Sequence, residues 1–313
     1  MRQPQVLPAS SVVICTRDRP ETLAQTLDSV LAQTYDRFDV LVVDQSKGEE
    51  TAQLVSRMAR DRPLLRYMRL HRAGLSRAYN AGIAGTGGQL LAFTDDDVVV
   101  PSDWLRNVAR AFAAHPQVRL LYGQVLLPPE LAEREGLDGV TPALPIAERR
   151  ILDRRHGFRV FGMGANFAAR RELFTRIGGF DEVLGGGGPL QSSQDFDFVY
   201  RAFRAGESTL LEPDVVAYHY GFRSYSGEWQ ATMRSYGIGV GGFYSKHVRA
   251  GDPYAAWLLL GVLGGSTARI AKRLLMRQPA RSNLTFVANV LAGVRRSFEF
   301  PIDRRLRLYR ARP

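Results

Sequence analysis

Short apolar runs alternate with helix-patterned segments through the first hundred residues of the chain. Residues 12–15, 40–43, 64–70 and 90–94 are predominantly apolar over four to seven positions, the length typical of a buried strand. Leu23, Leu27, Val30 and Leu31 recur at helical spacing, and residues 51–60 and 76–84 are also expected to be helical. Strands separated by single helices favour right-handed βαβ units, so the sequence predicts an α/β fold with a mostly parallel sheet.

Polar side chains follow three of these four predicted strands. Thr16 and Arg17 come after the first strand, Asp44 ends the second, and an aspartate triplet at 95–97 follows the fourth. In open parallel sheets, ligands bind beyond the carboxyl ends of the strands. We therefore expect these polar groups to meet at one edge of the sheet and to form the functional site.

Beyond residue 101 the pattern is less regular. Residues 128–158 contain four prolines and many charges, and we interpret them as an irregular excursion. Four consecutive glycines at 185–188 precede Asp195, which lies near the start of a predicted helix. The remaining expected elements are helices over 104–114 and 196–205 and strands over 118–127, 160–169, 210–211 and 215–219.

Three adjacent carboxylates, Asp95, Asp96 and Asp97, form the strongest chemical signal in the sequence. Their charges repel one another, and a divalent cation such as Mg²⁺ or Mn²⁺ would neutralise them while sharing a ligand phosphate. Alternate residues of a strand face the same side, which would bring Asp95 and Asp97 together. An acidic surface turn would also explain the triplet, but the apolar residues on both sides of it favour a metal site.

Three other polar residues have two interpretations each. Asp195 would be either a helix N-cap or a base that accepts a proton, and the long glycine approach favours the base. His219 would be structural, or a metal ligand if the triplet binds a cation, because imidazole suits Mn²⁺. Arg77, which follows Gly74 at a predicted helix start, would be either an exposed residue or a partner for a diphosphate.

The net charge of +11 is concentrated in the last part of the chain. Residues 1–219 carry 26 basic and 27 acidic side chains, whereas residues 220–313 carry 16 basic and four acidic ones. Basic helices with an aliphatic face fit contact with an anionic membrane, although a packed helical subdomain or an oligomer interface would share this pattern. The single Cys15 excludes an internal disulfide framework. No apolar leader opens the sequence, so we expect a cytoplasmic location.

Six motifs follow one another in order: 12–20 (VVICTRDRP), 42–44 (VVD), 74–82 (GLSRAYNAG), 93–97 (FTDDD), 194–195 (QD) and His219. Together, over residues 10–225, they resemble family 2 glycosyltransferases. The resemblance implies a GT-A fold, which is a Rossmann-like, mostly parallel sheet flanked by helices. The catalytic domain would span 1–225, with a nucleotide-binding half at 10–100 and an acceptor-binding half at 101–225. Residues 226–313 would form a basic, helical C-terminal extension.

The resemblance also implies an activity and roles for individual residues. The activity is metal-dependent, inverting transfer of a sugar from a nucleotide-sugar donor to a hydroxyl of a saccharide or lipid-linked glycan, in cell-surface polysaccharide or glycolipid synthesis. Asp195 would be the catalytic base, and Asp95, Asp97 and His219 would bind Mn²⁺ or Mg²⁺. The positions that would contact the nucleotide sugar are Thr16, Arg17, Asp44, Gly74, Arg77, Asp95 and Asp96.

The sequence departs from the family pattern in places that leave the donor and acceptor open. Gln194 stands where an acidic residue is common, Gln45 follows Asp44 where Asp-Gly or Asn-Gly is common, and Tyr79 replaces a common arginine. Two alternatives are a sugar nucleotidyltransferase and a non-enzymatic RNA-binding protein that uses the basic tail. The first would need a glycine-rich loop at 16–20, where this chain has no glycine. The second would need aromatic residues interleaved in an RNA-binding motif, which the tail does not show. We therefore expect no nucleic-acid partner. We expect peripheral contact with the inner face of the cytoplasmic membrane through residues 250–313.

Overall fold

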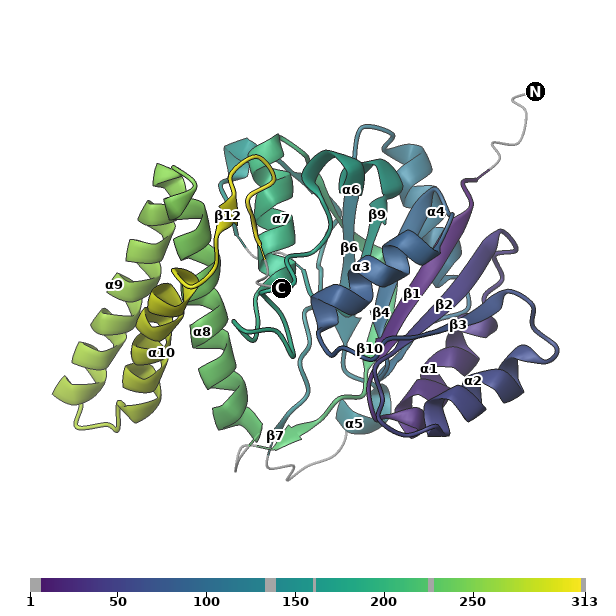
Figure 1. Cartoon of the computed structure of the whole chain (residues 1–313), viewed down its shortest axis with the longest axis horizontal. Coiled ribbons are helices and arrows are strands. Elements are labelled where there is room, and N and C mark those ends of the chain that lie inside the picture. The colour runs from purple at the N-terminus through teal and green to yellow at the C-terminus, as the bar shows by residue number, and fades with distance from the viewer. Residues whose placement is uncertain (1–6, 133–138, 160–161, 225–227, 311–313) are drawn as a thin grey trace. The chain divides into compact units, whose positions relative to one another are not determined.

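The computed structural model describes residues 7–132, 139–159, 162–224 and 228–310 (Figure 1). Its longer helices are α1 (Pro20–Leu31), α2 (Glu50–Ala59), α3 (Leu75–Gly85), α4 (Trp104–Ala114), α6 (Arg171–Ile177), α7 (Gln194–Ala205), α8 (Glu228–Arg249), α9 (Pro253–Leu275) and α10 (Arg281–Ser297). The short ones are α5 (Pro129–Ala132) and a 3₁₀ turn (Arg154–His156). Its strands are β1 (Ser10–Thr16), β2 (Phe38–Asp44), β3 (Leu65–Arg69), β4 (Leu90–Asp95), β5 (Val98–Val99), β6 (Leu120–Leu126), β7 (Gly139–Val140), β8 (Arg150–Leu152), β9 (Asn166–Arg170), β10 (Thr209–His219), β11 (Arg223–Ser224), β12 (Ile302–Asp303) and β13 (Leu308–Tyr309).

These elements form two compact units, and neither unit is continuous in sequence. The first unit contains Met1–Ala73, Ala78–Gly179 and Val199–Arg223. The second unit contains Gly74–Arg77, Phe180–Phe198 and Ser224–Pro313. The glycine-rich segment before α7 therefore belongs to the same unit as the C-terminal helices.

A mixed nine-stranded sheet is the centre of the first unit. Its order is β3-β2-β1-β4-β9-β6-β10-β5, and β8 pairs with β10 outside this path. Strands β3, β2, β1 and β4 are parallel, as the alternating strand and helix pattern predicts. Strand β9 is antiparallel to both β4 and β6. The predicted α/β fold with helices around a central sheet is confirmed.

Helices cover both faces of the parallel strands because the side chains of a strand alternate between faces. On one face, Leu23 and Leu27 of α1 are fully buried and pack in a cluster with Val12 and Ile14 of β1. On the other face α3 comes so close that a Cβ on Gly82 would lie 2.4 Å from Val13 Cγ1. Burial on both faces explains the continuous apolar run of this strand and holds its carboxyl end in place.

Several strands differ from the sequence-based expectation, and the short strands β7, β8, β11, β12 and β13 were not predicted. Strand β9 begins at Asn166 rather than at 160, and residues 160–161 lie outside the described part. The two short strands expected at 210–211 and 215–219 are one strand, β10, with an irregularity in its pairing to β6 between Glu212 and Val216. Strand β5, which follows the aspartate triplet directly, was not predicted. Its residues pair antiparallel with Tyr218 and His219, which brings the end of β10 to the triplet.

The second unit contains helices α8, α9 and α10 and the β12–β13 hairpin. Glycines let the backbones of α8 and α10 approach closely, because a Cβ on Gly241 would lie 2.0 Å from the carbonyl oxygen of Val290. A Cβ on Gly293 would similarly lie 2.1 Å from the carbonyl oxygen of Ile238. The C-terminal helical region predicted from the sequence is therefore present, and it is packed into a folded unit.

A fully buried polar cluster joins the segment before α7 to α8 within this unit. Lys246 Nζ lies 2.5 Å from Asp181 Oδ2 and 2.6 Å from Asp197 Oδ1, and none of the three side chains is exposed. His247 Nε2 lies 2.9 Å from the same oxygen of Asp197. The backbone N–H of Tyr309, in the C-terminal hairpin, donates to Asp181 Oδ2 at 2.8 Å. Buried charges require such partners, so the last residues of the chain help to hold the segment that leads into α7.

Helix α9 leaves most of its surface exposed. It extends over 23 residues, and among the described helices it alone is long and apolar enough to cross a membrane, with a mean hydropathy of 1.2. Only 11% of that apolar window is buried. Trp257 and Leu260 are 66% and 67% exposed.

Candidate functional site

The polar residues predicted to meet at the sheet edge do so in the first unit. In the registers of β1 with its neighbours, Thr16 pairs with Asp44, and Cys15 pairs with Asp95. Strands β1, β2 and β4 therefore end side by side and present Thr16, Asp44 and Asp95 at one edge. This follows from three parallel strands of matched length, as expected for a βαβ fold.

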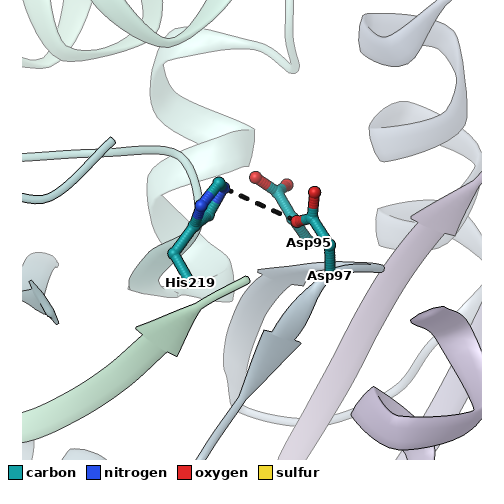
Figure 2. Close-up of side chains that lie close together, drawn as sticks. All are labelled: Asp95, Asp97 and His219. Carbon is teal, nitrogen blue, oxygen red and sulfur yellow. Dashed lines mark ion pairs between the residues drawn. The ribbon is translucent and has the colours of Figure 1, made fainter. Parts of the chain in front are cut away.

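Asp95, Asp97 and His219 converge beyond this edge, as Figure 2 shows. One ligand atom of each residue lies within 4.8 Å of those of the other two, and His219 Nε2 is 3.5 Å from Asp97 Oδ1. The strand ends at Asp95, so a turn, rather than strand alternation, brings Asp97 beside it. His219 comes from β10 and reaches the carboxylates because β5 pairs with that strand's end. Two carboxylates and an imidazole are donors that suit Mn²⁺.

Gly221 packs directly against two of these three side chains, Asp97 and His219. A Cβ on Gly221 would lie 2.4 Å from Asp97 Oδ2 and 2.6 Å from His219 Cε1. Any larger residue would displace the potential ligands. The chain is also held there by a hydrogen bond of 2.8 Å from the Tyr220 backbone N–H to the Asp97 carbonyl. The donor set fits a divalent cation, and the absence of a side chain at Gly221 lets Asp97 and His219 keep these positions.

Asp96, the middle residue of the triplet, is almost completely buried. The Thr16 hydroxyl donates to its Oδ2 at 2.6 Å, and Arg19 Nη1 donates to its Oδ1 at 3.3 Å. Burial raises the pKa of Asp96, while the bonds from Thr16 and Arg19 oppose that rise. The same guanidinium nitrogen is 3.3 Å from Asp97 Oδ2, so Arg19 partly offsets the charge of the triplet. Arg19 was not predicted as a site residue, although it stands in the first motif.

Asp44 is fully buried, and both of its carboxylate oxygens accept hydrogen bonds. The Ser46 backbone N–H donates to Oδ1 at 2.7 Å, and the Tyr67 hydroxyl donates to Oδ2 at 2.7 Å. Burial and the bond to Asp44 raise the pKa of Tyr67. Tyr67 carries no sequence signal, because it is an ordinary aromatic residue of β3 until the sheet pairing places it beside Asp44. Arg17, by contrast, is exposed, and its Nε lies 3.5 Å from Asp18 Oδ2.

Asp195 lies in the second unit, as the second residue of α7. Its side chain is partly buried, and its Oδ1 accepts a hydrogen bond of 2.9 Å from the Phe196 backbone N–H. Burial raises the pKa of Asp195. Two residues just before it, Gln191 and Ser193, have φ values of 65° and 69°, a conformation that L-residues rarely adopt. Such strain is frequent where a structure positions functional groups.

Gly74 and Arg77 also belong to the second unit, where they adjoin the glycine-rich segment. The Leu75 backbone N–H donates to the Gly186 carbonyl at 2.8 Å, and Arg77 Nη2 lies 3.0 Å from Glu182 Oε2. Gly74 has a φ of 142°, which favours glycine. Arg77 Nε is buried and makes no hydrogen bond to any residue that the structure describes. A buried donor of this kind is costly unless a ligand accepts from it.

The predicted site residues are thus divided between the two units. The first unit brings together Thr16, Asp44, Asp95, Asp96, Asp97 and His219. The second unit holds Gly74, Arg77 and Asp195. Each group is fixed within its own unit by the contacts described above.

Comparison with known proteins places the chain in a family. Residues 11–178, more than half of the chain, match the model described as "Glycosyl transferase family 2". The chain belongs to glycosyl transferase family 2. The matched region includes Thr16, Asp44 and the aspartate triplet but not Asp195 or His219. The family membership predicted from the ordered motifs is confirmed.

Curated relatives of this family member match it over only part of their length. It is 25% identical over 187 residues to a glucosyl-dolichyl phosphate glucuronosyltransferase of Haloferax volcanii, covering 56% of this chain and 56% of that protein. It is 29% identical over 218 residues to the succinoglycan biosynthesis protein ExoO of Rhizobium meliloti, covering 67% of this chain and 60% of that protein. The chain thus spans somewhat more than half the length of these relatives.

Solved structures share the fold of this family 2 protein at low sequence identity. The mannosyltransferase PcManGT from Pyrobaculum calidifontis, in complex with GDP-Man and Mn²⁺, gives a TM-score of 0.61 at 20% identity and covers 94% of this chain and 88% of that one. Residues 1–349 of TarS from S. aureus, in complex with UDP-GlcNAc, give a TM-score of 0.56 at 18% identity. This match covers 74% of this chain and 66% of that one. These similarities confirm the predicted GT-A fold.

Proposed function

We propose that this protein is a metal-dependent, inverting glycosyltransferase that moves a sugar from a nucleotide-sugar donor to a hydroxyl of a saccharide or lipid-linked glycan. The observation that carries the proposal is the cluster of Asp95, Asp97 and His219 at the carboxyl edge of a family 2 sheet. The similar structures with GDP-Man and UDP-GlcNAc support a nucleotide-sugar donor.

Asp95, Asp97 and His219 would hold Mn²⁺ or Mg²⁺. When bound, the cation offsets negative charge on the diphosphate that leaves the sugar. Complexes of similar structures with Mn²⁺ support the choice of metal.

The sheet edge next to the metal ligands would bind the nucleoside. Asp44, held by Ser46 and Tyr67, presents a fixed carboxylate, and Thr16 is fixed by its bond to Asp96. The exposed Arg17 would close over the nucleoside. Gly74 and Arg77 would contact the donor phosphates, and the buried Nε of Arg77 supports this role, since a phosphate oxygen would satisfy it.

Asp195 would be the catalytic base. Its carboxylate takes the proton of the acceptor hydroxyl as the acceptor oxygen bonds to the anomeric carbon. The bond from that carbon to the diphosphate oxygen breaks on the opposite side, which inverts the configuration and releases a nucleoside diphosphate. The raised pKa of Asp195 supports this role, because a base works best when its pKa lies closer to the working pH.

The acceptor and the location of the protein are part of the same proposal. The names of the two relatives, one acting on a dolichyl phosphate and one in succinoglycan synthesis, support a lipid-linked or polysaccharide acceptor. The exposed apolar and cationic side chains of residues 250–310 support peripheral binding at the inner face of the cytoplasmic membrane through residues 250–313. Anionic vesicles should sediment the protein, and neutral vesicles should not.

A donor screen tests the proposed activity. Each nucleotide sugar is incubated with the protein and Mn²⁺, and both thermal stabilisation and release of nucleoside diphosphate are measured. We expect one donor class to stabilise the protein and to be consumed, and we expect EDTA to abolish both effects. If no donor gives either signal, the transferase proposal is wrong. If the signals persist in EDTA, the metal roles of Asp95, Asp97 and His219 are wrong.

A further inference from the structure

An open groove lies among helices α8, α9 and α10, all within the second unit. Its volume is about 400 Å³, and its walls are mainly aromatic and aliphatic. Tyr244 of α8 and Phe286 of α10 form two sides, and one face of α9 forms the third, from Trp257 to Arg269. Twelve residues of helix separate these two ends, which corresponds to a length of about 18 Å. The groove therefore has an apolar body with a single cation, Arg269, at one end.

The groove is open because two of its lining residues are glycines. A Cβ on Gly261 would meet no atom within 4 Å, and one on Gly265 would meet only Arg269 Nη1, at 3.7 Å. The glycines of α8 and α10 differ, since a Cβ on Gly241 would collide with the facing backbone. Glycine inside a helix costs roughly 1 kcal/mol relative to alanine. At Gly261 no close helix contact requires it, so its effect is to leave the groove unfilled.

The charged side chains of α9 and α10 have one sign. Between residues 253 and 298 the sequence contains seven arginines and lysines and no aspartate or glutamate. Exposed apolar side chains accompany these cations, among them Leu260, Leu274 and Leu275, which are 67%, 61% and 86% exposed. An apolar groove inside such a surface is complementary to a molecule with an apolar chain and an anionic head.

We propose that this groove binds one hydrocarbon chain of an anionic membrane lipid, with the lipid phosphate at Arg269. The apolar walls from Trp257 to Val262 take the chain, and the exposed guanidinium of Arg269 pairs with the phosphate. The protein would therefore extract a lipid chain from the bilayer surface rather than only adsorb to it. The groove is independent of the sugar-transfer reaction, since none of its lining residues has a role there.

Dodecyl phosphate, kept below its critical micelle concentration, is the probe for this site. Binding to the full chain is followed by isothermal titration calorimetry, with inorganic phosphate and dodecanol in parallel. We expect dodecyl phosphate to bind with the highest affinity, because only this probe offers both the chain and the charge. If inorganic phosphate binds with the same affinity as dodecyl phosphate, the site is a simple anion site and the proposal is wrong.

Two pairs of variants locate the binding. Gly261→Leu places a side chain in the groove. Gly264→Leu is the control, because it adds the same side chain to the same helix at a position outside the groove lining. At both positions a Cβ would meet no atom within 4 Å. Both variants should fold with equal or higher thermal stability, because leucine favours helix more than glycine does. Gly261→Leu should weaken dodecyl phosphate binding about tenfold or more, the effect of displacing two methylenes. Gly264→Leu should bind like the unmodified chain.

A second pair of variants tests the contribution of the Arg269 charge in the same way. Arg269→Gln should weaken dodecyl phosphate binding about threefold to tenfold, because it removes an exposed ion pair. Arg295→Gln, an exposed residue outside the groove lining, should leave it unchanged. Equal binding by the two glycine variants would overturn the proposal. So would the finding that Gly261→Leu converts a dimer to a monomer without changing probe binding, because a second copy of the chain would then occupy the groove. Donor binding measured on the same variants keeps this result separate from the transferase proposal.

Discussion

Replacing Lys246 with methionine should destabilise the protein more than any other single lysine substitution. Lys246 Nζ lies 2.5 Å and 2.6 Å from the carboxylates of Asp181 and Asp197, and all three side chains have no exposure. Lys246→Met keeps most of the apolar volume but leaves two carboxylates without their shared cation. Breaking a buried ion pair from one side costs about 3–5 kcal/mol. That is a large part of the roughly 5–15 kcal/mol that stabilises a typical domain.

The same substitution should make stability depend on pH. Burial already raises the pKa of Asp181, and Lys246 opposes that rise, so its removal raises the pKa further. The folded protein then holds a proton that the unfolded chain has lost, and the free energy of unfolding falls as pH rises between the two pKa values. The deficit of Lys246→Met should therefore be smaller at pH 5 than at pH 8.

Urea unfolding followed by circular dichroism at both pH values measures these effects. Lys272→Met is the matched control, because Lys272 is exposed on α9 and its loss should change the free energy of unfolding by less than about 0.5 kcal/mol. A loss below about 1 kcal/mol for Lys246→Met, or an equal loss at both pH values, would show that the carboxylates are not held by this lysine.

Three further predictions concern the sheet edge. Asp97→Asn should abolish the thermal stabilisation by Mn²⁺, whereas Asp103→Asn, at the exposed start of α4, should retain it; equal responses would refute the metal assignment. Gly221→Ala should weaken Mn²⁺ binding in calorimetry, because its Cβ would lie 2.4 Å from Asp97 Oδ2 and displace that carboxylate, and unchanged affinity would show that the position of Asp97 does not depend on this glycine. Tyr67→Phe should lower the free energy of unfolding by about 1–3 kcal/mol in urea, because it removes the donor to buried Asp44, and no loss would contradict that bond.

The parallel half of the fold was predictable because its signals are local. Each of β1, β2 and β4 is a short apolar run buried on both faces, and each ends at a polar residue, so the position of Thr16, Asp44 and Asp95 followed from the pattern. The antiparallel direction of β9 was not predictable, because an antiparallel neighbour of β4 has the same apolar composition as a parallel one.

Contacts between residues far apart in the chain could not be predicted from the sequence either. Tyr67 and Arg19 become site residues only when sheet pairing and the turn after β4 place them beside carboxylates. Lys246 looked like one more cation of a basic tail, yet it is buried against Asp181 and Asp197. The charge count alone does not distinguish a lysine that faces solvent from one that neutralises two buried carboxylates.

The most direct test of the proposed transferase uses Asp195→Asn. With the donor identified by the screen, donor binding is measured by calorimetry with Mn²⁺, and sugar transfer is measured by release of nucleoside diphosphate in the presence of acceptor. We predict that the variant binds the donor within about twofold of the unmodified protein and transfers at least about a hundredfold more slowly, the range expected for loss of a general base. Normal transfer by Asp195→Asn would contradict the account.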